Sequence, residues 1–318
     1  MTTGAIGVHI QERDAAAAVR AIEEAERRGV PAAWMTTGGL APDALSVFAA
    51  AAVRTQTILL GTAIAPIFPR HPLAMVQQVT PIAQLAPGRL MLGIGPSHKP
   101  SVEGTYGIPF EKPLGHLREY IAVLRQLLTT GEVDFDGAFY HAHGRLPTPL
   151  AQPPAIMASA LREHAFRLCG EIADGAITWI CPLSHIERVG LPAVRAGAER
   201  AGRTPPPIVA HVPIVLTTDA DAARAVARQQ LAVYPRLPYY RRMLIDAGYP
   251  EAERSEWSDA MIDAVVAYGD EETVARRLRA FFAAGVGAII AAPFPAGEDR
   301  DAERGRAYDF LGALAKAG

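Results

Sequence analysis

The chain has 318 residues, of which 50% are hydrophobic, and its formal net charge at pH 7 is −2. This length and composition suit one large α/β domain, or two smaller ones, with an extensive hydrophobic core. Because the net charge is small and no long basic run occurs, a nucleic-acid partner or a charged membrane surface has little electrostatic support. The two cysteines, Cys169 and Cys181, form no CxxC motif, so the sequence favours neither a disulfide framework nor a zinc site.

The sequence shows no targeting segment. The first ten residues, MTTGAIGVHI, lack a charged start and a long apolar core. No run of about 18 apolar residues occurs that could span a bilayer. We therefore expect a cytoplasmic protein that does not enter a membrane.

Buried strands and amphipathic helices alternate along almost the whole chain. Short apolar runs predict eight strands, in chain order Gly4–Ile10, Ala32–Met35, Ile58–Ala65, Arg89–Gly95, Ala155–Ser159, Gly175–Ile180, Ile208–Leu216 and Val286–Ala292. Apolar residues at helical spacing predict helices over Asp14–Arg28, Pro42–Arg54, Pro72–Ala86, Pro113–Thr129, Arg162–Ile172, His185–Ala201, from Asp219 onward, over Glu271–Ala284 and from about Arg300. This alternation predicts a (β/α)8 TIM barrel with insertions.

The most informative segment covers residues 58–98. Ile58–Ala65 is too short and too β-branched for a helix, so it is interpreted as a buried strand. A helix begins at His71 and Pro72, since proline is tolerated at the first helical position, and Arg89–Gly95 is again an apolar strand. Two buried strands joined by a helix form a parallel βαβ unit. Both strands end in small residues followed by polar ones, at the edge where such proteins place their chemistry.

Two regions fit no simple strand–helix unit. Residues 131–153 predict an exposed hairpin that turns at Asp136-Gly137. Residues 235–268 are a candidate lid. We expect residues 1–318 to form a single barrel domain with these two insertions, and loops at 99–112 and 235–268 to shape a substrate pocket.

Polar residues follow several predicted strands at their carboxyl ends. His98 can act there as a general acid at neutral pH, although an ordinary loop histidine fits equally well. Gly95 and Ser97 belong to GIGPS, which lacks a dinucleotide fingerprint and indicates close approach of the backbone to a flat ligand or to a neighbouring strand. Thr36 ends the second strand in a similar way, with a flexible loop as the alternative.

The segment SALRE joins the fifth strand to its helix. Ser159 is a candidate N-cap, and the amides of Ala160, Leu161 and Arg162 could bind a phosphate, although capping without a ligand is equally consistent. Trp179 ends the sixth strand and could flank an aromatic ring, but packing is the commoner role of such a residue.

The other histidines are weaker candidates. His9 lies in the first strand and is expected to face the barrel interior, where a lone histidine is usually structural. His141 and His143 share one face of the hairpin. Because no third ligand accompanies them, we expect no metal site.

The chain resembles the luciferase-like monooxygenase superfamily, and within it the oxidoreductases that use the deazaflavin coenzyme F420. The motifs that carry the resemblance span nearly the whole sequence: LGTAIAPIFPRHP (Leu60–Pro72), PGRLMLGIGPSH (Pro87–His98), HLREYIAVLRQLL (His116–Leu128), RLCGEIADGAITW (Arg167–Trp179), QLAVYPRLPYYR (Gln230–Arg241), GDEETVARRL (Gly269–Leu278) and GVGAIIAAPF (Gly285–Phe294). The same barrel holds either F420 or FMN, so FMN is the alternative cofactor.

The resemblance implies a barrel that is usually homodimeric, with the cofactor ring at the C-terminal mouth. It places a non-proline cis peptide that backs the ring near Thr62–Ala65, around Ala63 and Ile64. It also places the proton donor after the fourth strand at His98, so His98→Ala is expected to reduce turnover far more than cofactor affinity.

Three further segments acquire implied roles from the resemblance. Ser159–Arg162 match a cofactor-phosphate region, and Trp179 matches a position near the ring. The second-strand loop carries Thr36-Thr37 where relatives often have aspartate or histidine. This departure points away from sugar-phosphate substrates.

Three functions follow from these features. The first is hydride transfer between F420 and an unsaturated carbon (C=C, C=N or C=O) of a small molecule. The second is an FMN-dependent two-component monooxygenase. The third is a flavin-binding protein without turnover, which the polar residues at the barrel mouth disfavour.

Overall fold

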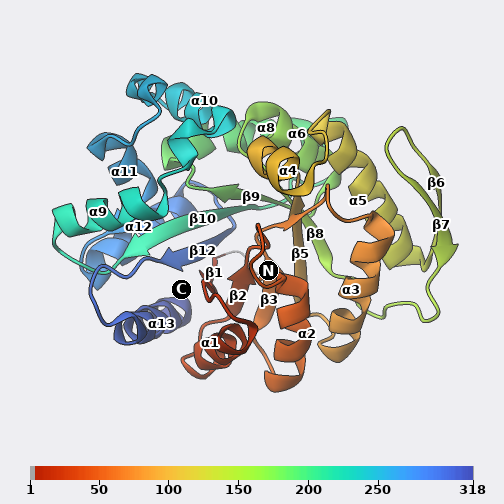
Figure 1. Cartoon of the computed structure of the whole chain (residues 1–318), viewed down its shortest axis with the longest axis horizontal. Helices are drawn as coiled ribbons and strands as arrows, with labels where there is room; N and C mark the ends of the chain where they lie inside the picture. Colours follow the sequence, from red (N-terminus) through yellow and green to blue (C-terminus); the bar gives the residue numbers. More distant parts are fainter. Residues whose placement is uncertain (1–3, 318) are drawn as a thin grey trace.

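A computed structural model describes residues 4–317, and its central feature is a closed barrel of parallel strands (Figure 1). In this part of the chain the barrel consists of eight strands, in order β1 (Ala5–His9), β2 (Ala32–Met35), β3 (Leu59–Thr62), β5 (Leu90–Gly95), β8 (Ala155–Ser159), β9 (Gly175–Trp179), β10 (Ile208–Val215) and β12 (Ala288–Pro293). The pairing of β12 with β1, with Ala288 opposite Ala5, closes the barrel. The predicted (β/α)8 fold is confirmed.

Helices surround the barrel at the predicted positions (Figure 1). They are α1 (Ala15–Arg27), α2 (Ala44–Arg54), α3 (Pro72–Leu85), α5 (Pro113–Thr130), α6 (Glu163–Ile172), α8 (Leu191–Arg200), α9 (Ala220–Gln230), α12 (Glu271–Ala283) and α13 (Arg300–Ala317). Four of them begin after an aspartate whose side chain accepts the backbone N–H three residues further on: Asp14, Asp43, Asp219 and Asp270. These N-caps explain why the helices start where the strand–helix loops end.

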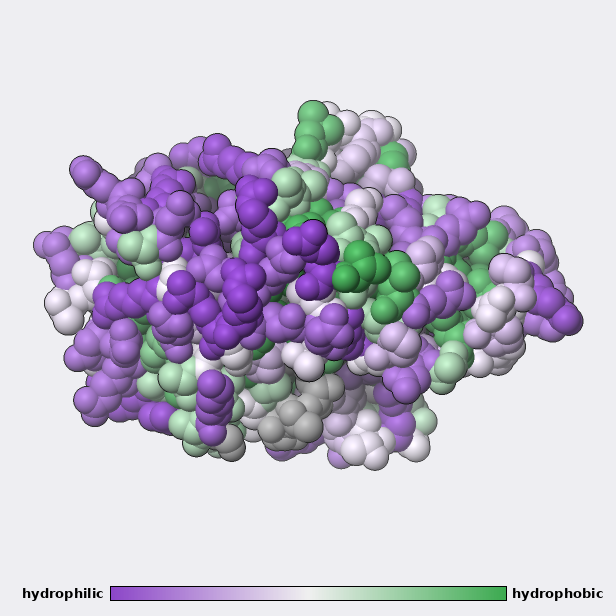
Figure 2. Space-filling model, turned by 90° about the horizontal axis from the view of Figure 1, so that it is seen from below, coloured by the Kyte–Doolittle hydropathy of each residue, from purple (hydrophilic) through white to green (hydrophobic). Residues whose placement is uncertain are grey.

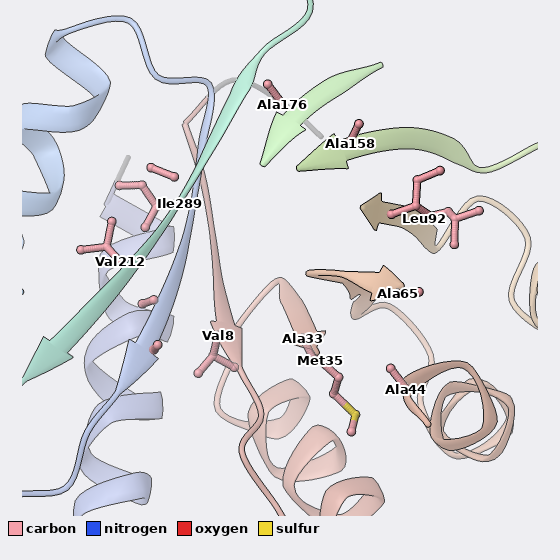
Figure 3. Close-up of a cluster of buried hydrophobic side chains, with 14 of the residues drawn as sticks. Val8, Ala33, Met35, Ala44, Ala65, Leu92, Ala158, Ala176, Val212 and Ile289 are labelled. Atoms are coloured by element: carbon pink, nitrogen blue, oxygen red, sulfur yellow. The ribbon is translucent and has the colours of Figure 1, made fainter. Parts of the chain in front are cut away.

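Side chains on the strands alternate between two layers. One set packs between the barrel and the helices, and Figure 3 shows members of it on strands from every side of the barrel, including Val8, Met35, Leu92 and Val212. The other set fills the barrel interior, where Trp34 packs with methionine, isoleucine, valine and alanine side chains from several strands. Because the period of a strand is two residues, His9, Trp179 and His211 share the inward face with this second set.

The indole of Trp34 leaves no room for a side chain at two positions on the adjacent strands. A Cβ atom on Gly7 of β1 or on Gly61 of β3 would overlap the indole ring. Glycine at both positions therefore lets one large side chain fill the middle of the barrel.

The structure of residues 131–153 agrees with the prediction, whereas that of residues 99–112 differs from it. The predicted hairpin is present as β6 (Glu132–Asp136) and β7 (His141–Arg145), which extend to the right in Figure 1. The expected loop at 99–112, by contrast, contains α4 (Lys99–Tyr106). Pro100 lies in its first turn, and Gly107 ends it in a left-handed conformation, so the sequence did contain helix boundary signals there.

The candidate lid at 235–268 is largely helical. It contains short helical turns η2 (Tyr234–Arg236) and η3 (Pro250–Arg254), the helices α10 (Pro238–Asp246) and α11 (Asp259–Val265), and the short strand β11 (Ala267–Tyr268). β11 pairs with the carboxyl end of β10. The helix predicted over 185–201 begins earlier, with α7 (Leu183–His185) and the π-helical turn η1 (Ile186–Gly190) preceding α8.

The surface carries mostly polar residues. Figure 2 shows a largely hydrophilic face with hydrophobic residues in separate groups. Large hydrophobic side chains are exposed at Leu40, Val53 and Leu85, which is usual on a protein surface. No helix within residues 4–317 is long and apolar enough to cross a membrane.

Candidate active site

The third barrel strand is interrupted at its carboxyl end. β3 stops at Thr62, the Ala63–Ile64 peptide bond is cis, and pairing resumes at β4 (Ala65–Pro66) beside β5. The resemblance placed a non-proline cis peptide at this point, and that prediction is confirmed.

Thr62 fastens this segment to β5. Its buried hydroxyl donates to the carbonyl oxygen of Gly93 (2.7 Å) and accepts from the N–H of Gly93 (2.9 Å). A Cβ atom on Gly93 would overlap the carbonyl oxygen of Thr62. The Thr62 side chain, predicted to be at the cofactor, therefore supports the cis peptide from the strand side.

The loop after β2 holds the cis peptide from the opposite direction. The hydroxyl of Thr36 donates to the carbonyl oxygen of Ala63 (2.5 Å), and the N–H of Thr37 donates to the carbonyl oxygen of Ile64 (3.1 Å). Thr36 also lies 3.1 Å, Oγ1 to Nε2, from the ring of His9. The structure thus brings together Thr36, Ala63 and Ile64, three of the residues predicted to contact the cofactor, and adds His9 to them.

His98 lies at the end of β5, on the other side of the mouth. Ser97 before it has a left-handed backbone (φ 63°), and His98 precedes α4 without making a side-chain cap. The His98 ring meets Tyr234 and Tyr240 edge-on, with centroids 6.0 and 5.6 Å away. Burial lowers the pKa of His98 below its usual value, which favours the neutral imidazole at pH 7.

A continuous arc of rings connects His98 to His9. From His98 it passes to Tyr234, then to Trp179 (centroids 6.0 Å apart), to His211 (4.2 Å) and to His9 (4.6 Å). We call these five side chains the mouth arc. Together with the cis peptide they line the C-terminal mouth, the position of catalytic sites in barrels of this kind.

Histidine ring nitrogens of the mouth arc are buried without a partner. Among residues 4–317 no hydrogen bond reaches Nδ1 of His9 or Nε2 of His211. Burial lowers the pKa of His9 to about 4, and burial together with the neighbouring His9 ring lowers that of His211. Both imidazoles are therefore neutral at pH 7. Buried polar atoms without partners are unfavourable in a folded protein, so a ligand that supplied the missing hydrogen bonds would be bound favourably here.

The SALRE segment differs from its prediction in two respects. The residue that precedes α6 is Arg162, not Ser159, which pairs in β8 with Ile177. The N–H of Ala160 is not free for a phosphate either, because it donates to the carbonyl oxygen of Ile177 (2.9 Å). Strand pairing extends further than the Ser159 capping signal suggested, which leaves Leu161 and Arg162 as the part of this loop that can meet an anion.

The glycine-rich GIGPS segment serves strand packing. A Cβ atom on Gly95 would overlap the hydroxyl of Ser159 on the adjacent strand. Of the two interpretations left open for this motif, close approach to a neighbouring strand therefore holds for Gly95 and for Gly93.

A cavity of about 290 Å³ extends from His9 outward, between the segments that follow β1, β10 and β12. Its walls combine apolar residues such as Leu216 and Phe294 with the amides of Gln11 and Gln230. Arginines of α13 also line it. Two loops were expected to shape a substrate pocket, residues 99–112 and 235–268, and neither lines this cavity.

Sequence reasoning missed three members of the site. His211 occupies an inward position of β10, which alternation along Ile208–Leu216 could have indicated. Tyr234 and Tyr240 come from the candidate lid, and their rings lie 4.9 Å apart. Their approach to His98 across more than 130 residues of sequence has no local signal.

The hairpin histidines lie outside this site. His141 pairs with Asp136 and His143 with Asp134, each at 2.7 Å, on an exposed face. Within the described residues no group of three or more histidine, cysteine, aspartate or glutamate side chains could hold a metal ion.

Comparison with known proteins agrees with this architecture. The family model described as luciferase-like monooxygenase matches residues 1–288. An uncharacterised protein of Mycobacterium tuberculosis (strain ATCC 25618 / H37Rv) is 30% identical over 284 residues, which cover 80% of this chain and 83% of that protein. The F420-dependent glucose-6-phosphate dehydrogenase of Gordonia bronchialis is 31% identical over 201 residues, covering 61% of this chain and 59% of its own length.

Among solved structures, an F420-dependent secondary alcohol dehydrogenase in complex with an F420-acetone adduct has a TM-score of 0.79. It is 18% identical and covers 99% of this chain and 98% of its own, a likeness that shows the fold alone. Since the family match extends from residue 1 to residue 288 and the fold agrees with it, this chain belongs to the luciferase-like monooxygenase family.

Proposed function

We propose that this protein is an oxidoreductase that transfers a hydride between coenzyme F420 and a small molecule with a carbonyl, imine or alkene carbon, in either direction. The observation that carries the proposal is the pair of unpartnered ring atoms beside the cis peptide, Nδ1 of His9 and Nε2 of His211. A flat ring with a polar edge, together with a polar substrate bound beside it, would satisfy such atoms while the ring packs against aromatic side chains.

The residues at the mouth fit a deazaflavin. Ala63 and Ile64 would back its ring, and the mouth arc would border it with neutral groups only. Leu161 and Arg162, at the start of α6, are the residues available for a phosphate of its tail. The name of the Gordonia bronchialis relative supports F420 over FMN.

When bound, F420 supplies a ring carbon that accepts or releases a hydride. The protein's own part is to orient the two reactants, exclude water and move one proton. Two neutral imidazoles at opposite ends of the mouth arc, His98 and His9, are placed to hold that proton.

Cofactor titration tests the proposal. We expect F420 to quench the tryptophan fluorescence of the purified protein at lower concentration than FMN does. The three tryptophans allow a sharper version: Trp179→Phe should lose most of the quenching amplitude, because Trp179 lies in the mouth arc. Trp257→Phe is the matched control, since the Trp257 indole donates to the carbonyl oxygen of Leu231 and is not part of the arc.

Each alternative has its own result. Tighter binding of FMN would replace the proposal with an FMN-dependent monooxygenase. Binding of F420 without turnover of any alcohol, carbonyl, imine or alkene would leave a binding protein. If neither cofactor binds, the barrel mouth serves another ligand and the proposal is wrong.

A further inference from the structure

The hydrogen bonds around Thr36 fix the position of one proton on His9. A threonine hydroxyl has a single proton to donate, and a carbonyl oxygen can only accept. Thr36 Oγ1 lies 2.5 Å from the carbonyl oxygen of Ala63, so the Thr36 proton goes there. The contact between Thr36 Oγ1 and His9 Nε2 (3.1 Å) therefore requires that His9 Nε2 carries a proton.

The other ring nitrogen of His9 is then defined as well. Burial lowers the pKa of His9 to about 4, so the imidazole is neutral at pH 7 and carries only the proton on Nε2. Its Nδ1 is an acceptor with a free lone pair. This atom is shielded from solvent and has no hydrogen-bond partner in the part of the chain that the structure describes.

The surroundings of His9 supply no donor for that lone pair. The His211 ring packs edge-on against it at 4.6 Å without a hydrogen bond. The cavity of about 290 Å³ does reach His9. A ligand that enters there can provide the missing O–H or N–H.

We propose that His9 is a catalytic residue whose tautomer is fixed by Thr36, and that its Nδ1 accepts the hydroxyl proton of a substrate that is an alcohol. This inference rests on the proposed function and deepens it by naming the substrate class. A ketone has no proton to donate to Nδ1, whereas an alcohol does.

In the oxidation, the alcohol loses one proton and one hydride. The O–H bond breaks and its proton goes to Nδ1 of His9, while the C–H bond on the same carbon breaks and its hydride, with two electrons, goes to the oxidised deazaflavin. A C=O bond forms in the substrate. In the reverse direction the protonated His9 returns the proton to the oxygen.

A hydrogen bond fixes the orientation of the His9 ring, whereas the His98 ring is held by packing. An effective base is commonly held by a third group, as Thr36 holds His9. The ring of His98 packs edge-on against Tyr234 and Tyr240 and makes no cap hydrogen bond to α4. Thr36 is a positioning residue in this scheme, and its hydroxyl connects the imidazole to the cis peptide.

Nitrogen-15 NMR of the histidine rings in the whole protein, without cofactor, tests the tautomer directly. His9 is assigned from its absence in His9→Gln. We expect a protonated Nε2 and an unprotonated Nδ1 at pH 7, and a mixture of both tautomers in Thr36→Val. Thr37→Val is the matched control, since the Thr37 hydroxyl contacts Asp43 and Ala44 rather than a histidine, and it should leave His9 unchanged. A protonated Nδ1, or a Thr36→Val spectrum identical to that of the unmodified protein, would overturn the proposal.

Kinetics with oxidised F420 and a panel of secondary alcohols test the chemical role. His9→Gln retains a side-chain donor for Thr36 but cannot take the proton, so kcat should fall by about 10²- to 10⁴-fold. Thr36→Val should lower kcat with little change in KM. Unchanged kcat in His9→Gln would overturn the role of His9. Failure of F420 to bind would overturn the proposed function and with it the hydride step, and the NMR result on the tautomer distinguishes the two failures.

Discussion

The hydroxyl of Thr62 bridges both backbone groups of Gly93, donating to its carbonyl oxygen and accepting from its N–H. This pair of bonds joins β3 to β5 immediately before the cis peptide, where regular strand pairing stops. The position of the cis-peptide segment therefore depends on the buried hydroxyl of Thr62 and on glycine, which has no side chain, at position 93.

Gly93→Ala should destabilise the protein and weaken cofactor binding. The new methyl group would overlap the carbonyl oxygen of Thr62, and a backbone atom cannot rotate away as a side chain can. We expect a loss of at least about 2 kcal/mol in unfolding free energy, measured by denaturant titration. Gly144→Ala in the hairpin, where a Cβ meets nothing within 4 Å, is the control and should be nearly neutral. Equal stability of the two variants would contradict this account.

Thr62→Val should cost about 1–3 kcal/mol of unfolding free energy, because it leaves the buried N–H of Gly93 without a partner at nearly constant side-chain volume. Thr62→Ser retains the hydroxyl and should recover most of that loss. The comparison of the two variants by thermal and denaturant unfolding separates the hydrogen bonds from the packing. If Ser and Val are equally destabilising, the hydroxyl is not the stabilising element.

Acid should destabilise the protein partly through His9. Its pKa is about 4 in the folded chain because of burial, and 6.5 is the ordinary value that applies when the chain is unfolded. Between these values the unfolded chain binds a proton that the folded chain does not, so the stabilisation is complete above pH 6.5 and is lost as the pH falls towards 4.

His9→Gln should therefore flatten the dependence of unfolding free energy on pH in that window, by up to about 1.4 kcal/mol per pH unit. Denaturant unfolding at several pH values between 4 and 7 measures the slope. His164→Gln, the same substitution at an exposed position of α6, is the control. A His9→Gln slope equal to that of the unmodified protein would show that His9 is not a buried neutral group.

The features that were predictable from the sequence are those with local causes. Continuous apolar runs mark the barrel strands, and aspartates such as Asp14 and Asp270 mark helix starts, because both signals act within a few residues. The position of the cis peptide at Ala63–Ile64 came from family resemblance, since no local pattern distinguishes it.

The features that escaped prediction depend on tertiary contacts. The strand end at Ser159 was predicted, but the capping role of Ser159 was not confirmed, because Ser159 pairs with Ile177 of β9 and Arg162 takes the position before α6. The contacts of His98 with Tyr234 and Tyr240 depend on how residues 234–240 fold over the mouth. They cannot be predicted from the sequence around His98 or from residues 234–240 separately. The role proposed for His9 depends on its hydrogen bond with Thr36, which joins residues 27 positions apart in the sequence.

His98→Ala should reduce turnover by less than His9→Gln does, and it should leave the affinity for F420 within a few-fold. The His98 ring packs against two tyrosines and lacks the hydrogen bond that orients His9, so its removal should cost positioning rather than proton transfer. We expect a fall in kcat below the roughly 10²-fold that marks the loss of a general acid or base. His98→Phe, which keeps the ring contacts, should restore most of the activity. Steady-state kinetics on the same alcohol for all three variants measures this order, and a His98→Ala defect equal to or larger than that of His9→Gln would assign the proton to His98 instead.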